Sequence, residues 1–155
     1  MELRRIGQVA GAPDGGAIVR LDERWRAGLD GMEGFGLVVV LWWAHEVGEA
    51  ERDLPTCRHP YRDGPPALGI LATRSAARPN PIGLSVAALI SVDAARGVLR
   101  LAHLDAVPGT PVIDVKPYTP SLDRVRQPSS PAWCAGWPAD LESSGTFDWS
   151  EVLVG

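Results

Sequence analysis

The chain has 155 residues, 45% of them hydrophobic and 22% charged, and a formal net charge of −4. This length suits one domain with a real core and is short for two ordinary domains, and the composition is that of a soluble globular protein. No apolar run approaches the roughly 18 residues of a membrane span, and no signal-peptide-like stretch opens the chain. We therefore expect a cytoplasmic protein without a membrane partner. The two cysteines lack a metal-ligand spacing, so no metal is expected.

Apolar runs and alternation place the elements of the first half of the chain. Strands are expected over Leu3–Val9 and Ala17–Leu21, followed by one or two helical turns over Asp22–Leu29. The strongest strand, Phe35–Ala44, is apolar on both faces and should be buried on both. Polar residues rich in proline and arginine predict a long loop over 46–66.

The second half predicts four more strands, over Leu68–Ala72, Leu84–Val92, Val98–Leu104 and Val112–Val115. A hairpin connection at 94–97 should join the middle two. Six or seven strands with almost no helix predict a mainly β, single-domain fold, a small barrel or sandwich. The doubly wound fold is disfavoured because no glycine-rich turn links a strand to a long helix.

The chain changes character from Pro117 onward. We expect the barrel domain to occupy residues 1–125, and residues 126–155 to form a loop-like tail. A disordered tail should lack large aromatic side chains, yet this one holds Trp133, Trp137 and Trp149. The tail should therefore pack on its own barrel or on a partner subunit.

Residues 72–85, with the sequence ATRSAARPNPIGLS, are the densest segment for chemistry. Two prolines exclude helix and hold Asn80 extended between them. Arg74 and Arg78 flank this rigid piece, and two guanidinium groups on a stiff loop suit carboxylate or phosphate oxygens. A proline-rich surface loop with solvated arginines is the alternative interpretation.

Residues 103–118, HLDAVPGTPVIDVKPY, form the second dense segment. Asp114 and Lys116 stand two apart in a strand, so their side chains should share a face. A plain surface salt bridge would explain them. However, Lys116 is the only lysine, whereas every other residue of the Lys and Arg type in the chain is arginine. This suggests a site that needs a compact ammonium group. His45 ends the central strand, where a structural and a catalytic role are both open.

The two dense segments resemble the two hallmarks of the TrmO (YaeB, TsaA-like) family of methyltransferases, in the family's order. The similarity extends over about residues 3–125. It implies a seven-stranded β barrel that works as a homodimer and binds S-adenosylmethionine near the subunit interface. The family's task implies N6 methylation of a threonylcarbamoylated adenosine beside the tRNA anticodon, with the tRNA anticodon loop as partner.

The resemblance also implies roles for residues that match motif positions. The cofactor site is expected to include His45, Arg74, Leu84, Ala102, His103, Leu104 and Asp105. Catalytic positions are expected at Asn80, Asp105, Asp114 and Lys116, and substrate-binding positions at Arg78 and Tyr118. The proton that leaves the substrate nitrogen could pass to Asp105, Asp114 or His45, and the sequence does not choose among them.

Three differences from the family pattern lie where a substrate could be recognised. Pro108 stands where the family usually has aspartate, residues 11–16 replace a longer basic segment, and the additional C-terminal domain of some bacterial members is missing. With the acidic net charge, these differences favour an alternative, a methyltransferase for a small molecule. A second alternative is a non-catalytic module that binds S-adenosylmethionine or RNA.

Overall fold

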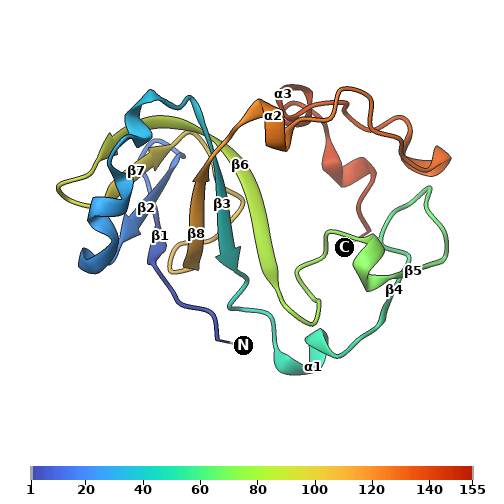
Figure 1. The fold of residues 1–155 in the computed structure, drawn as a ribbon. Coiled ribbons are helices and arrows are strands. Elements are labelled where there is room, and N and C mark those ends of the chain that lie inside the picture. The colour runs from blue at the N-terminus through green and yellow to red at the C-terminus, as the bar shows by residue number, and fades with distance from the viewer. Residues whose placement is uncertain (1, 155) are drawn as a thin grey trace. The chain divides into compact units, whose positions relative to one another are not determined.

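Six antiparallel strands close into a barrel in the computed structural model of the chain, which describes residues 2–154 (Figure 1). The strand order is β1-β2-β7-β6-β3-β8, and the pairing of β8 with β1 closes the barrel. The strands are β1 (Gly7–Gly11), β2 (Ala17–Leu21), β3 (Leu37–Trp43), β6 (Ile82–Asp93), β7 (Val98–Leu101) and β8 (Pro111–Pro117). The mainly β fold is confirmed, with six strands in the barrel rather than about seven.

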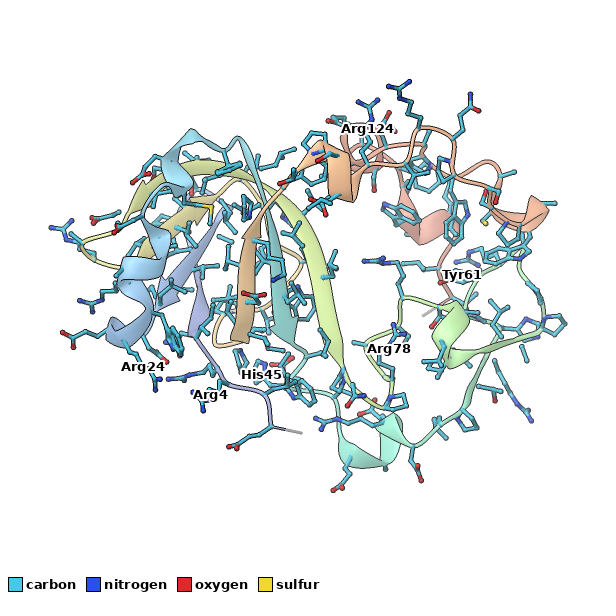
Figure 2. All side chains as sticks on the ribbon, viewed as in Figure 1. Arg4, Arg24, His45, Tyr61, Arg78 and Arg124 are labelled. Atoms are coloured by element: carbon cyan, nitrogen blue, oxygen red, sulfur yellow. The ribbon has the colours of Figure 1, made fainter. Side chains whose placement is uncertain are left out.

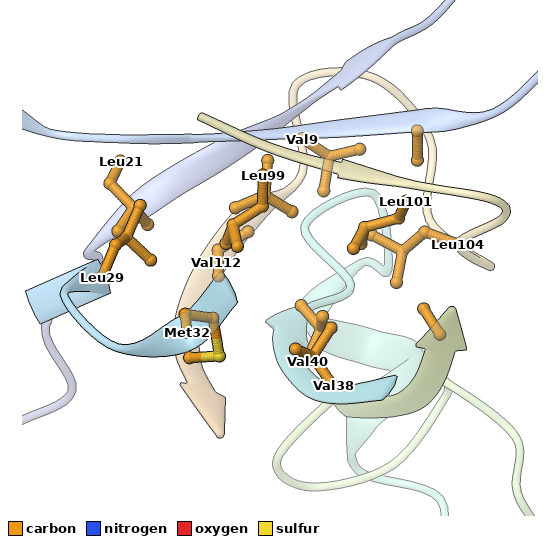
Figure 3. Packing of buried hydrophobic residues seen from close by; sticks show 13 residues of the cluster. Val9, Leu21, Leu29, Met32, Val38, Val40, Leu99, Leu101, Leu104 and Val112 are labelled. Carbon is orange, nitrogen blue, oxygen red and sulfur yellow. The ribbon is translucent and has the colours of Figure 1, made fainter. Parts of the chain in front are cut away.

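The barrel core is built by alternate residues of these strands, because successive strand side chains point to opposite faces. Val38 and Val40 of β3 are fully buried, as are Leu99 and Leu101 of β7. Two short 3-10 helices, η1 (Glu23–Leu29) and η2 (Met32–Gly34), add one buried side chain each to the same cluster, as Figure 3 shows. The expected helical turns after Asp22 are thus present as a 3-10 helix.

The connection between β6 and β7 is the hairpin expected at 94–97. Gly97 has a φ of +67°, a left-handed conformation that glycine adopts without steric cost. A Cβ atom here would also lie 2.5 Å from Cγ of Arg26. Glycine is therefore required at this turn both by its backbone conformation and by the packing of η1 beneath it.

Several element boundaries differ from the sequence prediction, and the strand expected over Val98–Leu104 ends at Leu101. The first strand begins at Gly7 rather than Leu3. The strand expected over Leu68–Ala72 is shortened to β5 (Ala67–Gly69), and its last residues form a 3-10 helix, η3 (Ile70–Ala72). The expected long loop contains two short elements, α1 (Glu49–Arg52) and β4 (Thr56–Arg58), and β4 pairs with β5.

The chain divides into two compact units. The first comprises the residues up to Gly48 and Asn80–Arg124, and the second comprises Glu49–Pro79 and the residues from Val125 onward. The tail therefore groups with the segment that holds β4 and β5. Its short helices are η4 (Ala132–Cys134), α3 (Leu141–Ser144) and η5 (Trp149–Glu151), while α2 (Pro120–Asp123) belongs to the first unit. No helix among residues 2–154 is long and apolar enough to cross a membrane.

Candidate functional site

His45 lies just beyond the end of β3, at the end of the barrel where β6 begins (Figure 2). Its imidazole is exposed, and its Nδ1 lies 3.4 Å from Oγ1 of Thr110. Thr110 is only 1% exposed, and its carbonyl oxygen accepts a 2.9 Å hydrogen bond from the amide of Val9. The buried hydroxyl of Thr110 thus contacts Nδ1 of His45, while the rest of this exposed side chain can reach solvent.

Thr110 was not singled out in the sequence, although it belongs to the second motif. Its partner His45 is 65 positions away, and the two meet only because β3 and β8 are neighbours in the barrel. The signal that could have indicated Thr110 is its place in the turn before a strand of the motif. Nothing local in the sequence indicated which side chain its hydroxyl would contact.

The predicted cofactor segment 102–105 forms the first part of the loop between β7 and β8. Ala102 donates its amide to the carbonyl of Ala88 at 3.0 Å, and Ala102, His103 and Asp105 are exposed. Leu104 points the other way and is buried in the barrel core (Figure 3). The leucine therefore anchors the loop, and a ligand can reach the polar neighbours and the backbone rather than the leucine side chain.

The end of the first motif packs against Trp42 of β3. Gly83 stands opposite Trp42 in the β3–β6 register, and a Cβ atom at Gly83 would lie 2.1 Å from Cε2 of the indole. The indole Nε1 donates a 3.0 Å hydrogen bond to Oγ of Ser85. Gly83 therefore leaves room for the tryptophan ring and Ser85 accepts its hydrogen bond. The sequence did not reveal this role. Leu84, between them on the opposite face of β6, is exposed.

Asp114 and Lys116 form an ion pair on one face of β8, with 2.5 Å between Oδ2 and Nζ, which confirms that they share a face. The hydrogen bond and charge of Asp114 raise the pKa of Lys116 above its ordinary value. The lysine side chain is 62% exposed, so the pair lies in water rather than in a dry cavity.

The ion pair is separated from His45 along the barrel. Six residues of β8 at about 3.3 Å each put roughly 20 Å between Thr110 and Lys116. Lys116 stands opposite Val39, and Tyr118 donates its amide to the carbonyl of Leu37 at the start of β3. The structure thus groups His45 with Thr110 at one end of β8, and places Lys116 and Tyr118 toward the other.

Arg74 and Arg78 belong to the second unit. They lie on a loop whose conformation is held by hydrogen bonds between its own residues. Oγ1 of Thr73 accepts from the amide of Ser75 at 3.2 Å, and Oγ of Ser75 accepts from the amide of Ala77 at 3.2 Å. Arg78 is half-buried and donates from Nη1 to the carbonyl of Thr73 at 3.3 Å. Arg74 is exposed, so it is the arginine of this loop that a ligand in solution reaches directly.

Asn80 begins the return of the chain to the first unit, and its side chain is exposed. Its carbonyl accepts a 2.7 Å hydrogen bond from the amide of Ile82, and the next residue, Pro81, is fully buried and accepts from Ala44. Asn80 thus lies in a bend at residues 78–80 rather than in the extended conformation expected between its two prolines, and both hydrogen bonds lie on its C-terminal side. Among residues 2–154, no group of three or more histidine, cysteine or acidic side chains is arranged to hold a metal ion.

Comparison with protein families gives one match over most of the chain. The family model described as the tRNA-methyltransferase O N-terminal domain matches residues 7–124. A probable S-adenosyl-L-methionine-binding protein of Halobacterium salinarum is 42% identical over 101 residues, which cover 65% of this chain and 74% of the relative. The tRNA (adenine(37)-N6)-methyltransferase of Escherichia coli is 39% identical over 126 residues, which cover 80% of this chain. The matched part is 53% of that enzyme, about half its length.

Solved structures give the same result. The crystal structure of TrmO from Pseudomonas aeruginosa superposes with a TM-score of 0.65 at 27% sequence identity. The superposition covers 83% of this chain and 60% of the solved chain. The tail, from residue 126 onward, lies beyond the family match, whereas both motifs lie inside it.

Proposed function

We propose that this chain, which belongs to the tRNA-methyltransferase O N-terminal domain family, is an S-adenosylmethionine-dependent methyltransferase. The observation that carries the proposal is the family match over residues 7–124, which contains both motifs and the whole barrel. Relatives whose names refer to S-adenosylmethionine and to methyl transfer support it.

The chemistry of the exposed groups fits such a cofactor. In the first unit, the residues assigned to it are His45, Leu84, Ala102, His103, Leu104 and Asp105. They offer an imidazole, a carboxylate, backbone amide groups and an exposed apolar side chain, which suit the polar and apolar parts of an adenosine. In the second unit, Arg74 offers a guanidinium for a carboxylate.

The reaction makes modest demands on the protein. The sulfonium of S-adenosylmethionine supplies an electrophilic methyl group, so the enzyme must place the attacking atom in line with it. A urea-type nitrogen on adenine must also lose its proton. His45 and Asp105 are exposed and able to accept one, whereas the carboxylate of Asp114 already pairs with Lys116. We therefore place His45 and Asp105 ahead of Asp114 as proton acceptors, with Asn80 and Lys116 as groups that orient the substrate.

The proposed substrate is a threonylcarbamoylated adenosine beside the anticodon of tRNA, with Arg78 and Tyr118 among the residues that bind it. The name of the Escherichia coli relative, which specifies N6 of adenine 37, supports this choice. Such an enzyme would act in the cytoplasm. We also propose a homodimer, because β6 exposes the apolar side chains of Leu84, Ala88 and Ile90.

The test is mass spectrometry of tRNA nucleosides from a strain in which the gene is deleted. We expect one N6-methylated, threonylcarbamoylated adenosine to disappear, and to return when the gene is restored. Restoration with a His45→Ala, Asp105→Ala double variant should fail. An unchanged nucleoside profile in the deletion strain would rule out the tRNA substrate.

Two other functions are each favoured by an observation. The archaeal relatives carry names that specify S-adenosyl-L-methionine binding without transfer, as a binding module would. A small-molecule methyltransferase is favoured by the net charge of −4 and by the turn at 11–16, which has no basic residue. A Cβ atom on Gly11 would lie 3.5 Å from Pro108, so two of the differences from the family pattern are neighbours. Cofactor binding without turnover on tRNA or on small acceptors would favour the module.

A further inference from the structure

Five aromatic side chains of the second unit form a continuous cluster. The ring of Tyr61 stacks on Trp133 with 5.2 Å between centroids, and Trp137 meets both of them edge-on at 4.9 and 5.4 Å. Trp149 extends the cluster from Trp137 at 5.5 Å, and Phe147 extends it from Trp149 at 4.9 Å. Four of the five come from the tail, and Tyr61 alone comes from the segment 49–79.

The tail is also bonded to the same segment through its backbone. Tyr61 and Leu153 form an antiparallel bridge, and the amide of Arg62 donates to the carbonyl of Val152 at 2.9 Å. The guanidinium of Arg62 donates to the carbonyl of Ser150 at 3.3 Å. The tail is therefore clamped onto residues 60–62 from two sides, by aromatic rings and by hydrogen bonds.

Without the tail, the segment 49–79 has little to hold it in shape. Its two strands have three residues each, and an isolated two-stranded hairpin is at best marginally stable in water. Among the described residues of this unit, the buried hydrophobic side chains are Tyr61, Ile70 and Cys134, and the last belongs to the tail. The tail thus supplies one of these three buried side chains and four of the five rings of the aromatic cluster that covers Tyr61.

The hairpin that the tail clamps leads directly into the loop of the first motif. β5 runs into η3, and the amide of Ile70 donates to the carbonyl of Pro55 at 2.9 Å, which ties η3 to the residue before β4. The buried hydroxyl of Thr73 donates to the carbonyl of Ile70 at 2.9 Å. Thr73 then bonds to Ser75 and Arg78, so the conformation of the arginine loop is built on Ile70.

We propose that the aromatic tail is the positioning element for the arginine loop at residues 73–78: the cluster around Trp137 fixes the β4–β5 hairpin, and the hairpin fixes Arg74 and Arg78. The ligand-binding consequence rests on the proposed function. The structural coupling does not, because it is a property of the second unit alone. A segment beyond the family match would thereby determine the geometry of a motif inside it.

The test compares Trp137→Ala with Trp137→Phe in the full chain by amide hydrogen exchange without ligand. Local opening exposes amides in proportion to the stability of the surrounding unit, so exchange over residues 70–78 should become at least about tenfold faster in Trp137→Ala. Trp137→Phe keeps an aromatic ring and should remain within about twofold of the parent. Exchange in β3 should not change. If Trp137→Ala fails to fold, Trp149→Ala at the margin of the cluster gives a smaller effect of the same pattern.

Trp25→Ala is the matched control, because Trp25 packs against the barrel core of the first unit. It should leave exchange over residues 70–78 unchanged. Calorimetry with S-adenosylmethionine then shows whether Trp137→Ala also weakens binding, with recovery in Trp137→Phe. Faster exchange at 60–62 with unchanged exchange at 70–78 would overturn the proposal. A parent chain that does not bind S-adenosylmethionine would contradict the proposed function and leave the exchange result valid.

Discussion

Thr110 is the buried hydroxyl on which the orientation of His45 depends, and the contact can be removed without changing the shape of the core. Thr110→Val deletes the 3.4 Å contact to Nδ1 and leaves a side chain of nearly the same volume. A hydrogen bond of this kind contributes about 0.5–1.5 kcal/mol, so affinity for S-adenosylmethionine should fall roughly two- to tenfold. Thr110→Ser retains the hydroxyl and should bind like the parent. Titration calorimetry on both variants measures the difference, and equal affinities would show that His45 needs no such support.

Lys116 can be tested separately for chemistry and for stability. Its ion pair with Asp114 is exposed and should contribute only about 0–1 kcal/mol to the free energy of unfolding. We expect Lys116→Arg to melt at nearly the parent temperature but to lose methyl transfer about tenfold or more, because a planar guanidinium does not fit an ammonium site. Single-turnover transfer at saturating cofactor gives the rate. Activity within twofold of the parent would make Lys116 an ordinary surface charge.

The two contacts show what could be predicted from the sequence at the scale of residues. The shared face of Asp114 and Lys116 followed from the two-residue period of a strand, which is a local property. The contact between Thr110 and His45 could not be predicted, because it depends on which strands become neighbours when the barrel closes. The ring of Trp42 on Gly83 depends in the same way on the register of β3 and β6.

Among the elements, β3 and β6 carry the closest packing between a motif and the barrel. Gly83→Ala would place a methyl group inside the indole of Trp42 and displace its bond to Ser85. Overpacking of this kind destabilises by about 1–3 kcal/mol. Gly36→Ala is the control, because no atom lies within 4 Å of a Cβ there, and it should be neutral or slightly stabilising. Chemical denaturation of the two variants gives both free energies of unfolding. If the free energy of unfolding of Gly83→Ala equals that of the parent, the indole of Trp42 moves aside freely.

The strands of the barrel were predictable because their apolar patterns are strong, and their ends were not. Leu3 is apolar but has no strand partner, whereas Gly7 pairs with both Leu21 and Val112, so pairing rather than hydrophobicity sets where β1 begins. Ile70 looked like a strand residue because it is apolar, and it is indeed buried, but in a 3-10 helix. At Ile70, hydrophobicity thus predicted burial correctly and the type of element wrongly, whereas Leu71 in the same predicted strand is exposed.

For the molecule as a whole, the proposed cofactor should act as a stabiliser. A ligand at 100 times its dissociation constant stabilises the folded state by about 2.7 kcal/mol, which for a chain of this size raises the melting temperature by about 5–11 °C. We expect one S-adenosylmethionine per chain, since each chain has one copy of both motifs. Arg74→Ala should weaken binding by about 1.5–3 kcal/mol and remove most of the shift.

The control for Arg74 is Arg96→Ala, which removes an exposed arginine from the β6–β7 hairpin. Its ion pair with Asp93 is exposed, and the variant should keep the full ligand-induced shift. Differential scanning fluorimetry with and without S-adenosylmethionine measures both variants beside the parent. A shift in Arg74→Ala equal to that of Arg96→Ala would remove Arg74 from the cofactor site.

The clamp between Tyr61 and the tail has a consequence during synthesis of the protein. At about 5–20 residues per second, the roughly 70 residues between Tyr61 and Trp133 take about 4–14 s to translate. During this interval the arginine loop of a nascent chain therefore lacks the aromatic residues of the tail that cover Tyr61. A chain stalled before Trp133 would carry both motifs and still lack the support that shapes the first of them.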